Sequence, residues 1–280
     1  MKNKILLIKT GNSETFGESK SNKIISLGDI LRVTVLLNFY NDKQVDWVTD
    51  PKAFPLLRGI SKIDQLYTVD DAIALNYTTY SLVINLEKSD FFLTQKMSNT
   101  NCVGFVKKNG IIHLKFKGQA KTLKYSGIKL TTPYENILCQ IIDKHWTGEP
   151  YLLGYKSKSI QKKAIGFNWK VGKKWPKKRL DKTFWGDLKL RLNEDGHVVS
   201  WQTGFNSLIE YIDWIQSCEV LVTLDSLGLH IAIALEKKVF AIFSNTFDHE
   251  INIKAPNKVF KLKNKNYEQI IQEIRKNLWL

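Results

Sequence analysis

Short apolar runs alternate with longer amphipathic stretches along this chain. Residues 5–8 form the first apolar run and predict a buried strand, and residues 27–39 then carry apolar side chains at helical spacing. The alternation continues with further predicted strands and helices at residues 45–48, 53–57, 65–69, 82–85 and 133–143. Such alternation is typical of a parallel sheet whose strands are connected by crossover helices.

The alternation stops in the middle of the chain and then restarts. Residues 106–125 are rich in lysine and show no regular pattern, and residues 151–163 are polar and basic, as in a linker. Predicted strands and helices then follow at residues 164–167, 183–193, 198–201, 207–217, 220–224, 229–236, 239–243 and 267–278. Two successive α/β units predict two Rossmann-like domains that face each other across a cleft. We therefore expect domains over residues 1–150 and 164–266, a linker over 151–163 and a terminal helix over 267–280.

The composition is that of a globular chain of ordinary hydrophobicity. Of the 280 residues, 43% are hydrophobic and 25% are charged, which is enough apolar material for a buried core. Cys102, Cys139 and Cys218 lie far apart, so neither a disulfide framework nor a thiolate zinc site is indicated. No apolar run reaches the ~18 residues of a membrane span, and residues 5–8 are too short for a signal-peptide core. We expect a cytoplasmic protein.

The chain is strongly basic, with 42 Lys and Arg against 27 Asp and Glu and a formal net charge of +15. Residues 156–191 hold 13 of the Lys and Arg and only Asp181 and Asp187 as acidic residues, so this segment alone contributes +11. Such an excess calls for an anionic partner. Nucleic acid is one alternative, but no helix-turn-helix, ribonucleoprotein or zinc-finger motif is present, and nucleic acid is not the expected partner.

Ligands of open α/β sheets bind where the carboxyl ends of strands meet the N-termini of helices, and Gly28 and Asp29 fall at such a junction. Gly28 allows a tight turn or a close approach of the backbone to a ligand. The macrodipole of the predicted helix favours the ionised form of Asp29, and an ionised carboxylate beside a ligand can act as a general base. The alternative is that Asp29 only caps the helix.

A second junction combines Asp225, Ser226 and Gly228 between an apolar strand and an apolar helix. It offers a carboxylate acceptor, a hydroxyl and the backbone amides of a helix N-terminus, a set that can hold a ribose and a diphosphate. The segment is neither a G-x-G-x-x-G motif nor a Walker motif. Helix capping by Asp225 or Ser226 is the alternative interpretation.

A third junction, residues 168–179, interleaves lysines with tryptophans and also follows a predicted strand. Its cations could neutralise a diphosphate, and a side chain such as Trp169 could stack on a base or cover a sugar. We single out Lys173, although most charge runs are simply solvated surfaces. The five histidines lack metal-binding spacing and there is no G-x-S-x-G motif, so neither metal catalysis nor a nucleophilic triad is expected.

Taken in order along the chain, several segments resemble glycosyltransferase family 9, the family of the bacterial heptosyltransferases. The matching segments are LGDILR at residues 27–32, VDWVT at 45–49, LVINL at 82–86, KWP at 174–176, VTLDS at 222–226 with His230, and 239–243 followed by Thr246. The resemblance covers nearly the whole chain in the right order. It implies the GT-B fold, with residues 1–150 on the acceptor side and residues 164–266 binding a nucleotide sugar.

The resemblance also implies an activity: inverting, metal-independent transfer of a sugar, typically heptose from ADP-heptose, to lipopolysaccharide, lipooligosaccharide or another surface glycan. Asp29 would then be the base that deprotonates the acceptor hydroxyl, and Lys173 would neutralise the departing diphosphate. The implied donor-binding residues are Gly28, Trp169, Lys173, Asp225, Ser226, Leu227, Gly228, His230 and Thr246. No cofactor or metal is expected beside the nucleotide-sugar substrate.

Three other interpretations of the same residues stay open. A related transferase could use another nucleotide sugar for capsule or protein glycosylation, the chain could be a non-catalytic protein that keeps the fold, or its charge could bind nucleic acid. Under the main interpretation, the partners are a nucleotide-sugar donor and a glycolipid or surface-glycan acceptor. The basic segment over residues 156–191 adds the expectation of peripheral contact with an anionic inner membrane.

Overall fold

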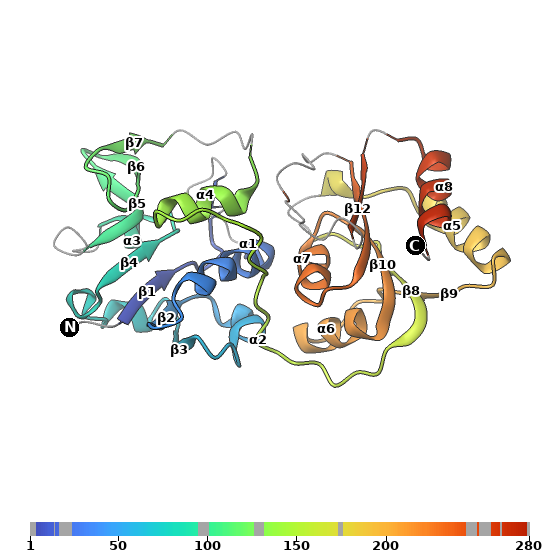
Figure 1. Ribbon diagram of the computed structural model, residues 1–280, viewed down its shortest axis with the longest axis horizontal. Helices are drawn as coiled ribbons and strands as arrows, with labels where there is room; N and C mark the ends of the chain where they lie inside the picture. Colours follow the sequence, from blue (N-terminus) through green and yellow to red (C-terminus); the bar gives the residue numbers. More distant parts are fainter. Residues whose placement is uncertain are drawn as a thin grey trace. The chain divides into compact units, whose positions relative to one another are not determined.

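The computed structural model describes residues 4–13, 15–16, 24–94, 101–125, 132–172, 176–244, 251, 259–263 and 265–278. The chain folds as two α/β units that divide between Tyr155 and Lys156 (Figure 1). Each unit has its own sheet and its own buried core. The predicted α/β class, with two successive Rossmann-like units, is confirmed.

The first unit is built on a sheet with the strand order β3-β2-β1-β4-β5-β6-β7. Its strands are β1 (Lys4–Ile8), β2 (Gln44–Val48), β3 (Ile63–Tyr67), β4 (Leu82–Asn85), β5 (Cys102–Lys108), β6 (Ile111–Lys115) and β7 (Thr122–Lys124). Its α-helices are α1 (Leu27–Val33), α2 (Phe54–Leu57), α3 (Asp90–Thr94) and α4 (Tyr134–Ile141). Short 3-10 helices are η1 (Thr34–Phe39), η2 (Pro51–Ala53), η3 (Asp71–Ile73) and η4 (Tyr77–Thr79). Strands β1 to β5 pair in parallel.

The lysine-rich region over residues 106–125 is regular, so the prediction of irregular structure there is wrong. Strands β5, β6 and β7 form an antiparallel meander at one edge of the sheet (green in Figure 1). The β5–β6 turn consists of Asn109 and Gly110 with φ angles of 50° and 76°, the left-handed conformations that a two-residue hairpin turn requires. The pattern is hard to read because strand β7 has only three residues and none of them is buried.

The second unit has a parallel sheet with the order β12-β11-β10-β8-β9. Its strands are β8 (Lys162–Asn168), β9 (Val198–Trp201), β10 (Cys218–Leu224), β11 (Lys238–Phe243) and β12 (Val259–Lys263). Its helices are η6 (Pro176–Lys178), α5 (Lys182–Glu194), α6 (Leu208–Ser217), α7 (Leu227–Ala234) and α8 (Tyr267–Asn277). Strand β12 was not among the predicted elements.

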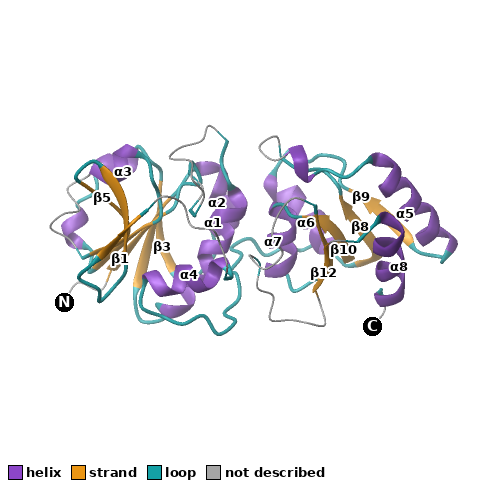
Figure 2. Cartoon of the chain, turned by 90° about the horizontal axis from the view of Figure 1, so that it is seen from above, coloured by secondary structure: helices purple, strands orange, loops and turns teal. Residues whose placement is uncertain are grey.

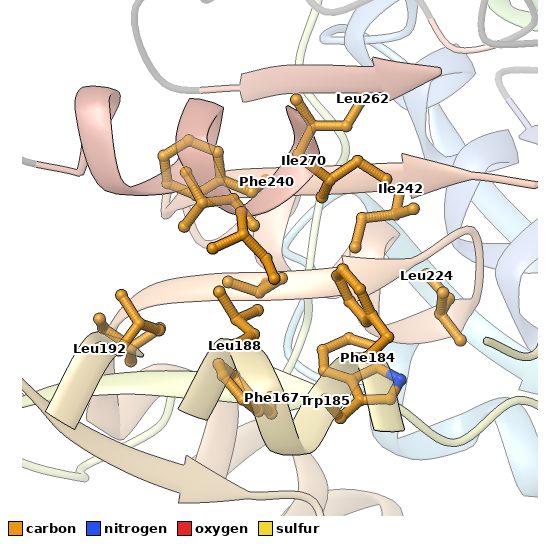
Figure 3. Packing of buried hydrophobic residues seen from close by; sticks show 14 of the residues in the cluster. Phe167, Phe184, Trp185, Leu188, Leu192, Leu224, Phe240, Ile242, Leu262 and Ile270 are labelled. Carbon is orange, nitrogen blue, oxygen red and sulfur yellow. The ribbon is translucent and has the colours of Figure 1, made fainter. Parts of the chain in front are cut away.

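Helices cover both faces of the second sheet. Helices α5 and α8 lie on one face, and α6 and α7 lie on the other (Figure 2). Figure 3 shows the α5 side of this core, where Phe184 and Leu188 of α5 meet Phe167 of β8, Leu224 of β10 and Ile270 of α8. Because α8 shares this core, the terminal helix is an integral part of the second unit.

The ends of the segment predicted as a linker belong to the two units. Tyr151 is buried and its hydroxyl donates to Glu135 Oε1 at 2.5 Å, while the Gly154 amide donates to the Leu56 carbonyl at 2.7 Å. Strand β8 already begins at Lys162. The connecting stretch is therefore shorter than residues 151–163.

Both sheets have a topological switch point beside their first strand. In the first unit the chain winds outward from β1 on one side and from β4 on the other, and in the second unit from β8 and β10. The crevice outside the carboxyl ends of two such strands is where open α/β sheets bind ligands. Each unit therefore has one natural ligand position, at the ends of β1 and β4 in the first and at the ends of β8 and β10 in the second.

Candidate functional site

A buried hydrogen-bonded network joins the carboxyl ends of β8 and β10. Asn168, the last residue of β8, is fully buried, and its amide nitrogen Nδ2 donates to Thr223 Oγ1 at 2.6 Å and to Ser226 Oγ at 2.9 Å. Asn168 stands directly beside Thr223 in the parallel register. Because both hydrogens of the amide are used, the Asn168 side chain has one defined orientation.

Helix α6 completes this network through Tyr211. Its hydroxyl donates to Asn168 Oδ1 at 2.6 Å, and burial raises the pKa of Tyr211 well above its ordinary value, so the donor proton is retained. Gly228, in the first turn of α7, packs directly on the pair. A Cβ atom on Gly228 would lie 2.2 Å from Tyr211 Oη and 2.3 Å from Asn168 Nδ2. Glycine is thus required for the start of α7 to reach this depth.

Ser226 precedes α7 at the N-cap position, but its side chain makes no capping hydrogen bond. Its hydroxyl accepts from Asn168 instead. The capping interpretation of Ser226 is therefore wrong, and the amides in the first turn of α7 have no side-chain cap. Uncapped amides at a helix N-terminus, combined with the macrodipole, favour an anion such as a phosphate.

An ion pair stands beside the same helix start. Lys178 Nζ, from η6, lies 2.6 Å from Asp225 Oδ2, and the two side chains are only 14% and 13% exposed. Lys178 belongs to the lysine-rich segment that the sequence predicts to lie at this edge, and the structure brings it to Asp225. A partly buried cation therefore lies at this helix start, paired with the carboxylate of Asp225.

Trp169 follows Asn168 and is held within its own unit. Its indole N–H donates to the Gln202 carbonyl at 2.9 Å, and its ring meets the edge of Trp201 with centroids 5.9 Å apart. Lys170 lies over the ring at 5.4 Å, and its ammonium group donates to the Thr203 carbonyl at 2.6 Å. Trp169 is therefore firmly positioned near the network, and its contact with a ligand stays a prediction.

The remaining predicted residues of this segment have different surroundings. Leu227 is partly exposed at the first position of α7, whereas His230, one turn later, is 5% exposed. Burial of His230 agrees with a packing role. Lys173 and Thr246 lie outside the described residues, so their predicted roles stay predictions.

At the switch point of the first unit, the crevice is occupied by the protein's own carboxylate. Glu87 follows β4 and is fully buried, and its Oε1 accepts from the amides of Thr10 and Gly11, both at 2.8 Å. Its Oε2 accepts from Ser13 Oγ at 2.6 Å, and Lys9 Nζ lies 3.4 Å from Oε1. The successive amides after β1 are an anion site, and Glu87 occupies it.

Asp29 lies next to this filled crevice. The loop that begins at Gly11 is closed at its base, because the Ser26 amide donates to the Gly11 carbonyl at 2.9 Å, and Ser26 is the N-cap of α1. Asp29 follows in the first turn of α1 and is half-buried. Within the described part of the chain, its carboxylate makes no hydrogen bond or ion pair, so it does not act as a helix cap.

Helix α1, which carries Asp29, is held in place by contacts with helix α4. Arg32, one turn later, donates from Nε to Glu135 Oε1 of α4 at 3.2 Å and stacks over the Tyr134 ring at 3.8 Å. Burial opposes the charge on Arg32, but Glu135 and other neighbouring groups outweigh it and raise the pKa of the guanidinium above its ordinary value. The two helices are therefore linked by a buried contact of Arg32 with Glu135, which supports the turn that carries Asp29. Gly28, beside it, has helical backbone in the same turn.

The described residues contain no group of three or more His, Cys, Asp and Glu side chains that could hold a metal ion. Among the same residues, no helix combines the length and the apolar character that a membrane span requires.

No family model matches the chain, and no curated protein matches its sequence. In structure it is similar to a family 9 glycosyl transferase from Veillonella parvula, with a TM-score of 0.63 and 14% identity over 99% of this chain and 97% of that one. It is also similar to the ADP-heptose lps heptosyltransferase II of E. coli, with a TM-score of 0.61 and 15% identity over 98% of both chains. The E. coli heptosyltransferase WaaC with ADP has a TM-score of 0.57 and 13% identity, again over 98% of both chains. The likeness is one of fold, and it spans the full length: the chain has the GT-B fold of the family 9 glycosyltransferases, as the sequence resemblance implies.

Proposed function

We propose that this protein is an inverting glycosyltransferase of the heptosyltransferase type, with the second unit on the donor side and the first unit on the acceptor side. One observation carries the proposal: the two switch points differ. The amides at the first are satisfied by Glu87, whereas the first turn of α7 at the second has no side-chain cap and lies beside Lys178. Only the second is suited to a diphosphate.

In this proposal the donor is held through its diphosphate and its ribose. The amides of Leu227 and Gly228 would bind phosphate oxygens, with Lys178 and Lys173 as the neighbouring cations. Asp225 would accept hydrogen bonds from ribose hydroxyls while Lys178 orients it. Trp169, His230 and Thr246 complete the proposed donor set. The network of Asn168 and Tyr211 has the role of positioning the start of α7.

The proposed chemistry needs one base and one leaving group. Asp29 removes the proton from the acceptor hydroxyl, the oxygen attacks the anomeric carbon from the face opposite the diphosphate, and the carbon–oxygen bond to the diphosphate breaks. The leaving nucleoside diphosphate takes the electron pair, and cations and helix amides stabilise its charge. The step needs no metal and no cofactor.

The proposed donor is ADP-heptose. Its support is a protein of the same fold, the ADP-heptose lps heptosyltransferase II of E. coli. For the acceptor we propose lipopolysaccharide, lipooligosaccharide or another surface glycan, reached from the cytoplasmic side of the inner membrane. A transfer of another sugar to a capsule or a protein is the second candidate, because no contact of the described residues selects the sugar.

The proposed base can be tested by a change of one functional group. Asp29→Asn keeps the size of the side chain but cannot accept the proton, so transfer should fall by a factor of about 100 or more while donor affinity is unchanged. Asp143→Asn is the matched control, because Asp143 is an exposed aspartate of the same unit. The measurement is the rate of nucleoside diphosphate release in the presence of a glycan acceptor. Full turnover by Asp29→Asn would remove Asp29 as the base.

A further inference from the structure

The positive charge of the first unit is concentrated at one edge of its sheet. Residues 1–155 carry 20 Lys and Arg against 14 Asp and Glu. Six of these lysines lie between residues 101 and 125, a stretch with no Asp or Glu: Lys107, Lys108, Lys115, Lys117, Lys121 and Lys124. The rest of residues 1–155, with 14 basic and 14 acidic residues, is neutral. We call residues 101–125, which contain β5, β6 and β7, the basic meander.

The fold places several of these lysines on one exposed face of the meander. Antiparallel pairing sets His113 opposite Lys124, and Lys108 opposite Ile111. Directly opposed residues of two strands point to the same face, about 5 Å apart. A shallow hollow in this region is lined by Lys108, Asn109, Ile111, His113, Ala120, Lys121 and Thr122. Lys108, Lys121 and Lys124 are among the exposed lysines of the meander.

The fold itself makes little use of these charges. Among the described residues, no carboxylate forms an ion pair with Lys108, Lys121 or Lys124, whereas other lysines of the chain, such as Lys178, are paired. Like charges that crowd together without counterions repel one another. An anionic partner would therefore meet cations that no carboxylate of the described residues already neutralises.

Apolar side chains at the same edge indicate what kind of anionic partner fits. Ile111, next to the hairpin turn and on the same face as Lys108, is 40% exposed. Leu123 of β7 is 58% exposed, but it pairs with Leu114 and so points to the other face of the sheet. No aromatic side chain of the meander is comparably exposed in the described residues. Surfaces that bind single-stranded nucleic acid stack the bases on exposed aromatic rings, so this combination does not fit them. Lysines beside an exposed aliphatic side chain match an anionic lipid surface.

We propose that the basic meander docks this protein on an anionic lipid bilayer. The hairpin turn at Asn109 and Gly110 lies at the end of β5 and β6 and carries Lys107, Lys108 and Ile111 beside it. The lysines contact lipid phosphates, and Ile111 enters the headgroup region. The proposal rests on the proposed function and adds to it a membrane-facing surface on the acceptor unit. It does not depend on the donor site.

The other basic segment, residues 156–191, is less suited to this role. Part of its charge is used within the second unit: Lys178 pairs with Asp225 at 2.6 Å, and Arg191 pairs with Glu268 at 2.7 Å. Lys170 is held by the Thr203 carbonyl. The segment nevertheless retains exposed lysines, which makes it the appropriate control.

The test is binding of the full chain to phosphatidylcholine vesicles with and without phosphatidylglycerol, measured by sedimentation. We expect binding only to the anionic vesicles, weakening as salt is added. Each lysine near an anionic surface contributes about fivefold in affinity, so the variant K108E/K121E/K124E should lose about a hundredfold or more. The control K156E/K182E/K189E removes the same charge from exposed lysines of the second unit and should keep most of the binding.

Two further variants keep the result interpretable. K108Q/K121Q/K124Q removes the charge without adding repulsion and should lose about a hundredfold, and Ile111→Ser should weaken binding while leaving the charge intact. Unchanged thermal unfolding shows that each variant is folded. Equal losses in the two lysine sets, equal binding to neutral vesicles, or tighter binding to duplex DNA than to anionic vesicles would overturn the proposal. Loss of vesicle binding with intact nucleotide-sugar binding would separate this proposal from the donor site.

Discussion

The close packing of Gly228 on Tyr211 and Asn168 leads to a prediction whose sign differs from the usual one. In an ordinary helix, replacing glycine by alanine stabilises the protein by up to about 1 kcal/mol, because alanine loses less backbone entropy on folding. At Gly228, however, the new Cβ would meet Tyr211 Oη at 2.2 Å and Asn168 Nδ2 at 2.3 Å. We therefore expect Gly228→Ala to destabilise the second unit.

The expected loss of stability in Gly228→Ala follows from the atoms that must move to relieve the clash. Non-bonded heavy atoms are comfortable at about 3.5 Å, so Tyr211 and Asn168 must shift by about 1 Å. That shift breaks both the 2.6 Å bond between Tyr211 and Asn168 and the 2.9 Å bond from Asn168 to Ser226. Two lost hydrogen bonds cost about 2 kcal/mol, and overpacking adds about 1–3 kcal/mol. After the helix-propensity gain, the net loss is about 2–4 kcal/mol.

The assay is urea unfolding followed by tryptophan fluorescence, with Gly186→Ala as the control. Gly186 lies in α5 and is exposed, and a Cβ atom added there would meet nothing within 4 Å, so this change should be neutral or stabilising by up to about 1 kcal/mol. In a Tyr211→Phe background the closest contact disappears, and the cost of Gly228→Ala should shrink. A Gly228→Ala protein that is as stable as the wild type, or that behaves like Gly186→Ala, would refute the predicted clash.

Further predictions concern the buried charges, the thiols and the donor cation. Glu87→Gln leaves Lys9 buried without its counterion and should cost about 3–5 kcal/mol in urea unfolding, and adding Lys9→Met should restore part of the loss. Burial raises the pKa of Cys218 from 9.0 to about 11 and those of Cys102 and Cys139 to about 12. The native thiols should therefore react slowly with a disulfide reagent at pH 8, and reaction at the unfolded rate would contradict their burial. As pH rises, the thiols ionise in the unfolded chain before they ionise in the folded one. The stability that the buried, protonated thiols contribute is therefore complete below pH 9.0 and is lost as pH rises toward 12. Urea midpoints measured across this pH range test the loss. Lys178→Met should weaken nucleotide-sugar binding about tenfold by calorimetry, and unchanged affinity would exclude Lys178 from the donor site.

The sequence pattern was sufficient for elements that are apolar over their whole length or strongly amphipathic. Strand β10 and helix α8 were both visible, because one has a continuous buried run and the other a clear apolar face. Strand β12 was missed because its lysines interrupt the apolar pattern, and β6 and β7 because they form a short, half-exposed edge. The apolar pattern is a weak guide where a strand is short or few of its residues are buried.

The candidate site was only partly visible in the sequence for a related reason. The Asp225-to-Gly228 junction could be found because its residues are neighbours in the chain. Asn168 is 58 residues from Ser226 and 43 from Tyr211, and Glu87 is 77 residues from Thr10, so these contacts exist only in the folded chain. Asn168 and the Asn85–Glu87 stretch share one local feature in the sequence: each places a polar residue at or just after the carboxyl end of an apolar strand.

Binding of a nucleotide-diphosphate sugar tests the central claim most directly. Titration calorimetry with ADP-heptose, and with GDP- and UDP-sugars in parallel, should show saturable binding of one donor at one site per chain. That binding should weaken in Lys178→Met and should be unaffected in Asp143→Asn. The absence of saturable binding for every nucleotide-diphosphate sugar would contradict a donor site at the switch point of the second unit. So would binding that is unchanged in Lys178→Met but abolished in Glu87→Gln.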